Sequence, residues 1–375
     1  MKIVHVISCL TKGGGERIVA ELANEAVKQG DEVAIIAAWP EDPVHLQDKI
    51  HPNVNIKFVA SQKLYAYLKI PYWILTNRKW IAGYDVLHCH LTFGGVFGSV
   101  ANIILKKIFR KRNPVIVETY HAVGMSIPKI NRWIHSRMAL LRDGLVLMAK
   151  DPYWNHFLLK HPNLKTEVIP NGVSVLIPQK NTALQQKFYK ELGIRDNCKY
   201  LVGTVGMLRP DRRPRSYIPI FRHIHAVLGN EVHFILAGGG IEFNKIKKLI
   251  EEEGLSDYVH MPGLVNNPTT TITNLDIYVS VSVGKTTGVS MIEAAMCKIP
   301  VVGIQLIDNY KAKNEDWVWS HTDTTEVAKK IIFLLQNVEE RDKLATNQNN
   351  YVNQHFTSAA MYTSYDLFYK KVLAQ

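Results

Sequence analysis

Residues Leu275–Pro300 read LDIYVSVSVGKTTGVSMIEAAMCKIP. Ile277–Val283 is a β-branched, mostly apolar run, which is typical of a buried strand. A loop of small residues follows at Gly284–Gly288, and Ser290–Cys297 has the composition of a helix. Such a loop lies outside the carboxyl end of its strand, where open parallel sheets bind ligands, and a helix start favours an anion. Taken alone, the segment is explained equally well by a strand-to-helix turn without a ligand.

The composition is that of an ordinary globular protein with a basic surface. The 375 residues are enough for two domains, each with its own core, and 47% of them are hydrophobic and 21% charged. The net charge of +12 and the isoelectric point near 9.3 predict a partner that carries negative charge. A nucleotide, an acidic lipid surface and a nucleic acid all fit, but we find no nucleic-acid recognition motif and expect no nucleic acid as partner.

The cysteines and the apolar runs indicate a cytoplasmic protein. The chain has four scattered cysteines, Cys9, Cys89, Cys198 and Cys297. Because no Cys-x-x-Cys pair occurs, a structural zinc site and a disulfide framework are both disfavoured, and a reducing cytosol is expected. Met1–Ser8 is too short for a signal peptide. The longest apolar run, Leu91–Leu105, is interrupted by Gly, Ser and Asn, so we expect no transmembrane segment.

The opening segment resembles the donor-binding signature of the family-4 retaining glycosyltransferases, known as group 1. That signature is usually Glu-Gly-Phe-Gly, four further residues, Glu-Ala and finally Pro-Val-Val. Gly288, Glu293-Ala294 and Pro300–Val302 match it. The resemblance covers the sheet-forming segments of both halves of the chain and is most specific over Gly203–Val302.

Lys285 departs from the signature, because it holds the place of the family's first Glu and is followed by Thr286 and Thr287. In relatives this carboxylate accepts hydrogen bonds from sugar hydroxyls, whereas an ammonium group only donates. Three hypotheses are open. The donor sugar carries an anion, such as a uronic acid, that pairs with Lys285. Alternatively, Lys285 contacts the diphosphate and leaves the hydroxyls to Thr286 and Thr287, or the protein binds a nucleotide and transfers nothing.

A glycine-rich loop follows the first predicted strand, Lys2–Ile7. Its residues Gly13–Arg17 resemble the Gly-Gly-x-Glu-Arg opening of the same family, in which the backbone around Gly14 and Gly15 lies close to the donor phosphates and the acceptor. The spacing is not Gly-x-Gly-x-x-Gly, so a dinucleotide site is disfavoured.

Several histidines follow predicted strands of the first half. Asp85–His90 matches the Asp-Val-x-His-x-His segment of the family, and Val115–Thr119 leads into His121. The resemblance places His121 beside the transferring sugar, where a neutral imidazole hydrogen-bonds a hydroxyl or orients the leaving group. We expect His88 and His90 on opposite faces of their strand, which argues against a metal pair.

A turn with three arginines follows the first strand of the second half. Gly206–Arg213 resembles the family's Gly-Arg-Leu, three residues, then Lys-Gly, whose Arg and Lys hold the donor diphosphate. Met207 takes the place of that Arg, but Arg209 lies two residues further on, and Arg212 stands for the Lys. Guanidinium groups bind phosphate oxygens in bidentate geometry, so we favour a phosphate site over an ordinary basic surface turn.

The resemblance implies an α/β protein of GT-B architecture, with two Rossmann-like doubly wound domains facing each other across a cleft. The acceptor would lie on the first domain and the nucleotide sugar mainly on the second. There, the Thr286–Val289 backbone would bind the diphosphate, Glu293 the ribose hydroxyls and the Val265 backbone the base.

The polar segment Gln179–Asn197 predicts the interdomain crossing. The expected ranges are an N-terminal domain over 1–172, a linker over 173–198, a C-terminal domain over 199–355 and a helix over 356–375 that packs back on the N-terminal domain.

The implied activity is sugar transfer from a UDP- or GDP-sugar to a glycan or lipid-linked acceptor, with retained configuration, in bacterial surface polysaccharide or lipopolysaccharide assembly. His121 and Lys285 are the residues expected nearest to the chemistry. Neither domain has an Asp-x-Asp motif, so we expect no metal and no cofactor. Two alternatives are a silent nucleotide-binding partner of another glycosyltransferase and a nucleotide-sugar epimerase.

Three segments of the first half combine basic and aromatic or apolar residues: Lys63–Trp80, Leu105–Arg112 and Ile127–Arg142. Each on its own is explained by a solvated helix face. Together they suit an anionic bilayer, because the aliphatic parts of the Lys and Arg side chains and the aromatic rings enter the bilayer while the charged groups contact lipid headgroups. We therefore predict a peripheral protein at the inner face of the cytoplasmic membrane.

Overall fold

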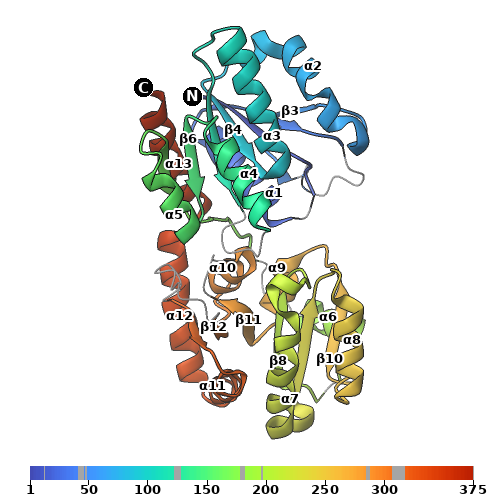
Figure 1. Cartoon of the computed structure of the whole chain (residues 1–375). Helices are drawn as coiled ribbons and strands as arrows, with labels where there is room; N and C mark the ends of the chain where they lie inside the picture. Colours follow the sequence, from blue (N-terminus) through green and yellow to red (C-terminus); the bar gives the residue numbers. More distant parts are fainter. Residues whose placement is uncertain are drawn as a thin grey trace. The chain divides into compact units, whose positions relative to one another are not determined.

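The computed structural model describes residues 1–11, 13–40, 46, 49–121, 128–177, 182–195, 197–283, 288–305 and 317–374. It divides into two compact units, one formed by Met1–Gly172 with Thr357–Gln375 and the other by Val173–Phe356 (Figure 1). The described part of the expected linker belongs to the second unit and includes helix α6 (Thr182–Leu192). Each unit is described below by itself.

The first unit is built on a seven-stranded sheet in which every described pairing is parallel. Its strands, in spatial order, are β3 (Asn55–Phe58), β2 (Glu32–Ala37), β1 (Lys2–Ile7), β4 (Val86–His90), β5 (Val115–Tyr120), β6 (Gly144–Leu147) and β7 (Lys165–Val168). The helices are α1 (Gly14–Lys28), α2 (Lys63–Ile81), α3 (Leu91–Ala101) with a π-helical continuation (Asn102–Ile108), α4 (Lys129–Ala139), α5 (Pro152–Leu159) and α13 (Ser358–Leu373).

Side chains along the central strands alternate between the two faces of this sheet, as the period of two requires. Val4 and Val6 of β1 pack in a core with side chains of α2 and α3, such as Ile70 and Phe97. His5, between them in sequence, therefore lies on the other face. Both faces are covered, as is usual for a parallel sheet.

Helix α13 covers that second face, although it is the last element of the chain (Figure 1). The hydroxyl of Tyr365 lies 2.9 Å from Thr119 Oγ1 of β5, and that of Tyr369 lies 2.7 Å from His88 Nδ1 of β4. Tyr362 also hydrogen-bonds Asp31. Polar contacts thus join the end of the chain to the middle of the first sheet.

One helical stretch of the described chain, Leu91–Ile108, is long and apolar enough to cross a membrane by length and composition. It comprises α3 and its π-helical continuation, and its buried side chains Phe93, Phe97, Ile104 and Leu105 belong to the core of the first unit. Packing against the sheet accounts for its apolar character.

The second unit contains a six-stranded sheet, again parallel throughout its described pairings. Its strands, in spatial order, are β10 (Val259–Gly263), β9 (Val232–Ala237), β8 (Tyr200–Val205), β11 (Ile277–Val283), β12 (Val301–Gln305) and β13 (Trp319–His321). Besides α6, the helices are α7 (Tyr217–Leu228), α8 (Phe243–Glu252), α9 (Pro268–Thr273), α10 (Val289–Met296), α11 (Thr324–Gln336) and α12 (Val338–His355).

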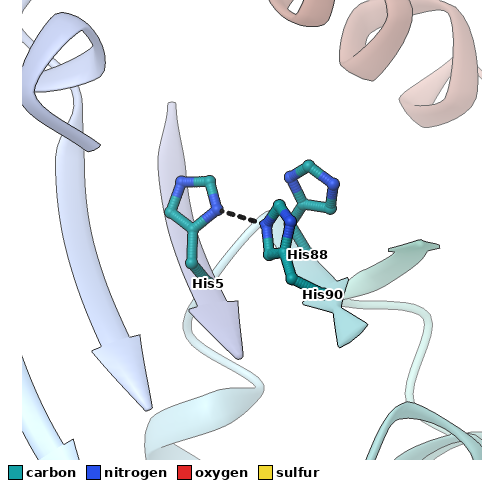
Figure 2. A group of neighbouring side chains, drawn as sticks. All are labelled: His5, His88 and His90. Atoms are coloured by element: carbon teal, nitrogen blue, oxygen red, sulfur yellow. Dashed lines mark hydrogen bonds between the residues drawn. The ribbon is translucent and has the colours of Figure 1, made fainter. Parts of the chain in front are cut away.

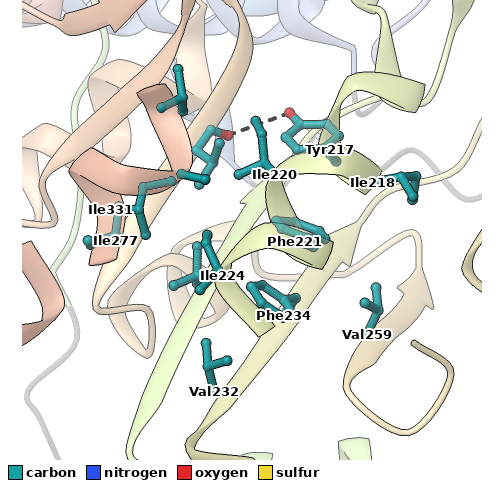
Figure 3. Close-up of a cluster of buried hydrophobic side chains, with 14 of the residues drawn as sticks. Tyr217, Ile218, Ile220, Phe221, Ile224, Val232, Phe234, Val259, Ile277 and Ile331 are labelled. Carbon is teal, nitrogen blue, oxygen red and sulfur yellow. Dashed lines mark hydrogen bonds between the residues drawn. The ribbon is translucent and has the colours of Figure 1, made fainter. Parts of the chain in front are cut away.

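The core of the second unit lies between this sheet and α7, α8 and α11 (Figure 3). Phe221 of α7 stacks on Phe234 of β9, with ring centroids 4.3 Å apart, and Ile224 and Ile331 are fully buried beside them. The strand predicted over Ile277–Val283 is confirmed with the same bounds.

In each sheet the strand order reverses once near the middle, between β1 and β4 in the first unit and between β8 and β11 in the second. Loops that follow two such strands lead to opposite faces of the sheet, and open α/β sheets bind ligands at these points. The sequence-predicted site residues can now be placed relative to these two edges.

Candidate functional site

The start of helix α10 lies at the carboxyl edge of the second sheet, directly after β11. Gly288 is its N-cap residue and has no side chain with which to accept hydrogen bonds from the first N–H groups of the helix. Val289 is the first helical residue. The predicted neighbours Lys285, Thr286 and Thr287 lie outside the described residues.

A buried tyrosine joins α10 to the neighbouring strand. The hydroxyl of Tyr278 in β11 lies 3.0 Å from the carbonyl oxygen of Val205, the last residue of β8, and 2.8 Å from Ser290 Oγ in the first turn of α10. Burial raises the pKa of Tyr278, so the hydroxyl keeps its proton. Tyr278 therefore links the end of β8 to the first turn of α10. In the sequence, Tyr278 stands out only as the single aromatic residue of the predicted buried strand Ile277–Val283.

The loop after β8 is held against the loop after β9 by backbone hydrogen bonds. Gly206 N donates to Ala237 O over 2.9 Å, and Leu208 N donates to Gly239 O over 2.8 Å. Gly238 has φ +144°, and a Cβ there would lie 1.8 Å from the Gly206 carbonyl oxygen. Only glycine permits this close approach, which fixes the start of the arginine turn.

Arg209 and Arg212 lie together in this turn, around the short 3₁₀ helix Pro210–Arg212. Both side chains are partly exposed, at 38% and 43%. Arg209 makes a bidentate pair with Asp211, with Nε 3.1 Å from Oδ1 and Nη2 2.9 Å from Oδ2, and Arg212 Nε lies 3.9 Å from Oδ2. The sequence prediction gave no role to Asp211, which holds the Arg209 guanidinium in one orientation.

Glu293 is buried within α10, at 5% exposure. Its charge adds to the effect of burial in raising the pKa of Cys297 to about 12, and it also raises the pKa of Tyr278. Val265 follows β10, which is separated from β8 by β9, so it lies further along the same edge than the arginine turn. The structure thus brings Arg209, Arg212 and Gly288 to adjacent strands and sets Val265 apart from them.

In the first unit, the loop after β1 lies next to the start of α3. Gly13 is the N-cap of α1, and Gly14 and Gly15 form its first turn. A Cβ on Gly15 would lie 3.3 Å from Leu91 Cδ2, whereas one on Gly14 would meet nothing within 4 Å. The predicted glycines therefore lie where the strand order of the first sheet reverses.

His121 directly follows β5 and is joined to two buried histidines. Its Nε2 lies 3.1 Å from His90 Nδ1, and His90 Nε2 lies 3.1 Å from His5 Nδ1 of β1 (Figure 2 shows the second of these contacts). Burial lowers the pKa of His5 to about 3 and that of His121 to about 4, so both rings are neutral near pH 7. Neither His5 nor His90 had been assigned a role from the sequence.

The expectation that His88 and His90 lie on opposite faces of their strand is wrong. Their ring centroids are 3.9 Å apart, because residues i and i+2 of a strand share a face (Figure 2). With His5 they offer three nitrogen atoms within 4.8 Å of one another. However, both nitrogens of His88 are already engaged, by Thr119 Oγ1 at 2.8 Å and by Tyr369 OH at 2.7 Å.

Comparison with known proteins finds one family model in each half of the chain. The family model for glycosyl transferases group 1 matches residues 185–351, and that for glycosyltransferase family 4 matches residues 12–175. The Escherichia coli O-antigen biosynthesis glycosyltransferase WclY is 22% identical, with 95% of this chain and 99% of that protein covered.

Solved structures of the same fold cover nearly the whole chain. The structure of HepE from Anabaena in complex with UDP and glucose has a TM-score of 0.78 and 16% identity, and covers 99% of this chain and 100% of that one. WaaG, a glycosyltransferase involved in lipopolysaccharide biosynthesis, has a TM-score of 0.67 and 12% identity, with 98% and 99% covered. The two Rossmann-like units are therefore those of the GT-B fold. With both halves matched by its models, the chain belongs to the family-4, group 1 glycosyltransferases.

Proposed function

We propose that this glycosyltransferase takes a sugar from UDP or GDP and transfers it, with retained configuration, to a glycan or lipid-linked acceptor of bacterial surface polysaccharide. The observation that carries the proposal is the edge between β8 and β11. Two arginines follow β8 there, and β11 leads to the start of α10, whose N-cap is a glycine. The names of WclY and WaaG support the pathway class, and the UDP and glucose bound to HepE support the donor class.

Diphosphate recognition is the proposed role of this edge. Arg209 and Arg212 would pair with the phosphate oxygens, and the first N–H groups of α10 would donate to them. As the bond to the sugar breaks, negative charge grows on the diphosphate, and the same donors stabilise it without having to reorganise. The contact with Asp211 occupies Nε and one N–H of Nη2 and so orients the Arg209 guanidinium, whose other N–H groups would donate to the phosphate oxygens.

The remaining donor contacts are assigned by the family pattern. Glu293 would accept hydrogen bonds from the ribose, the Val265 backbone would contact the base, and His121 would lie at the transferring sugar. We expect the departing diphosphate to receive the acceptor proton, so that no protein base and no metal is required. Lys285 would either pair with an anionic donor sugar or add a further charge at the diphosphate.

The first experiment is thermal unfolding in the presence of UDP, GDP and a panel of their sugars. A ligand at a hundred times its Kd adds about 2.7 kcal/mol to the stability of the folded protein, which is easily measured. Stabilisation by one sugar nucleotide, followed by nucleotide release only when an acceptor is present, supports the proposal. Stabilisation without turnover would identify the silent partner, and conversion of the donor without an acceptor would identify the epimerase.

We further propose that the first unit binds the acceptor at an anionic membrane surface on the cytoplasmic side. Helix α2 exposes Leu64, Leu68 and Tyr72, at 75%, 80% and 71%. Their spacing of four residues puts them on one face of the helix. Ile108 follows Lys106 and Lys107, and it is also exposed. Exposed apolar side chains beside lysines suit a bilayer with acidic headgroups better than they suit bulk water.

A further inference from the structure

Three histidines of the first unit form one chain of hydrogen bonds from the buried middle of the sheet to its carboxyl edge. His5 Nδ1 lies 3.1 Å from His90 Nε2, and His90 Nδ1 lies 3.1 Å from His121 Nε2. His5 is 1% exposed and His90 is fully buried. The chain ends in one direction at His5 Nε2, which has no hydrogen-bond partner among the described residues.

Neutral imidazoles in such a chain cannot choose their tautomers independently. Each ring carries a single N–H, so each contact needs a donor on one side and a lone pair on the other. Only two arrangements satisfy both contacts. In the inward arrangement every Nε2 carries the proton, and in the outward arrangement every Nδ1 carries it.

The end of the chain at His5 decides between the two arrangements. The inward arrangement buries the Nε2–H of His5 without an acceptor, whereas the outward arrangement leaves only a lone pair there. In the backbone of folded proteins, buried N–H groups without an acceptor are rarer than carbonyl oxygens without a donor, and we apply the same order to the two imidazole nitrogens. We infer that His5 and His90 are positioning residues that hold His121 as the Nδ1–H tautomer, so that it presents a hydrogen-bond donor. Among the described residues Nδ1 of His121 has no partner of its own.

A metal ion is the other reading of this cluster, and the contacts disfavour it. An ion bound by His5, His88 and His90 would have to displace Thr119 or Tyr369 from His88. No carboxylate belongs to the described cluster, so the charge of a divalent ion would be buried uncompensated.

The consequence for ligand binding rests on the proposed function. A fixed N–H on His121 would donate to an oxygen atom of the donor sugar, and it would not accept from a sugar hydroxyl. Loss of tautomer control would weaken that one hydrogen bond without removing any group from the site.

The test is long-range ¹H–¹⁵N correlation on the full chain with ¹⁵N-labelled histidine, which distinguishes Nδ1–H from Nε2–H. Variants of His5, His90 and His121 assign the signals. The expected result is an Nδ1–H tautomer for all three rings in the unsubstituted protein. Nε2–H on His121 would overturn the inference, and so would a shift of these signals on addition of zinc, which would identify a metal site.

His5→Phe keeps an aromatic side chain at this position but removes the ring nitrogens that form the first hydrogen bond of the chain. We expect His121 then to populate both tautomers and the Kd for the sugar nucleotide to rise about threefold to tenfold. Thr119→Val is the matched control, because it removes two buried hydrogen bonds, to His88 and to Tyr365, but leaves the histidine chain intact. A tautomer of His121 that is unchanged in His5→Phe, or changed equally in Thr119→Val, contradicts the inference. If no sugar nucleotide binds the unsubstituted protein, the proposed function fails. The tautomer measurement still shows whether the three histidines adopt the outward arrangement.

Discussion

The Tyr278 hydroxyl lies 3.0 Å from the carbonyl oxygen of Val205, and this contact joins β11 to the end of β8 where the strand order of the second sheet reverses. The same hydroxyl reaches Ser290 in α10. One side chain thus sets the distance between the arginine turn and the helix start that together are proposed to bind the diphosphate.

Tyr278→Phe removes this connection and little else. We expect a loss of about 1–3 kcal/mol in the free energy of unfolding, because the buried Val205 carbonyl and the partly buried Ser290 hydroxyl lose their partner. The KM for the donor should also rise, since the arginine turn and α10 are no longer held together. Tyr217→Phe is the control: its hydroxyl is buried in the same unit, on Thr204, but does not reach α10. Equal effects of both variants on KM would contradict a positioning role for Tyr278.

Arg209→Ala should weaken UDP binding about tenfold to a hundredfold, which is the range for a lost charge-assisted hydrogen bond. Titration calorimetry with UDP measures it directly. Arg222→Ala removes an arginine of the same unit that is paired with Glu253 on the surface. If it weakens binding as much as Arg209→Ala does, the effect is one of overall charge and not of a diphosphate contact.

Lys285→Glu separates the explanations for the departure from the family signature. If the donor sugar is acidic, the variant should transfer neutral sugars better and acidic ones worse, because a carboxylate repels the anion and accepts from hydroxyls. Competition between a UDP-uronic acid and its neutral counterpart gives the ratio. An unchanged donor preference with weaker UDP binding would instead assign Lys285 to the diphosphate.

Leu68→Gln should reduce binding to vesicles of anionic lipid at low salt, because the side chain is 80% exposed on the apolar face of α2. Co-sedimentation with vesicles measures the bound fraction. Leu159→Gln on α5 is matched to it, with 81% exposure in the same unit. Vesicle binding that is unaffected by Leu68→Gln, or reduced equally by both changes, would show that α2 is not the contact.

The free energy of unfolding should decrease as the pH is lowered, with a slope set by the buried histidines. Burial lowers the pKa of His5 to about 3 and of His121 to about 4, and it keeps that of His88 and His90 well below the ordinary value near 6.5. Below pH 6.5 the unfolded chain binds protons that the folded chain does not, so stability is lost as the pH falls from about 6.5 towards 4. Each histidine contributes about 1.4 kcal/mol per pH unit to this slope.

Urea unfolding between pH 5 and 7 gives the slope. His5→Phe should make it shallower by the contribution of one histidine. The same slope in the unsubstituted protein and in His5→Phe would mean that His5 is not held neutral by the fold.

Much of the fold follows from local sequence patterns, whereas the contacts that join the site residues to one another do not. The strand Ile277–Val283 and the helix after it are fixed by β-branched residues and a small-residue loop, which act within a few residues. The contact of Tyr278 with Val205 spans 73 residues, and that of Tyr369 with His88 spans 281. Such pairings depend on strand order, which one sequence does not give.

The histidines show the same limit in another form. His121 was singled out by its place after a strand and by its match to the family pattern. Its connection to His90 and His5, however, requires β1 and β4 to be neighbours in the sheet. The prediction about His88 and His90 failed for a simpler reason, the period of two along a strand. Asp211 was visible in the sequence, but its contact with Arg209 depends on the 3₁₀ turn.

Helix α13 makes the first unit discontinuous in the sequence, and this has a consequence for biosynthesis. The ribosome completes Met1–Gly172 and the whole of Val173–Phe356 before it makes Thr357–Gln375. Until then Thr119 and His88 lack the tyrosines that cover them, so this part of the sheet that holds His5 and His90 is incompletely covered. The second unit is therefore expected to mature on the nascent chain before the first unit is complete, and that interval is when the first unit is most open to chaperones and proteases.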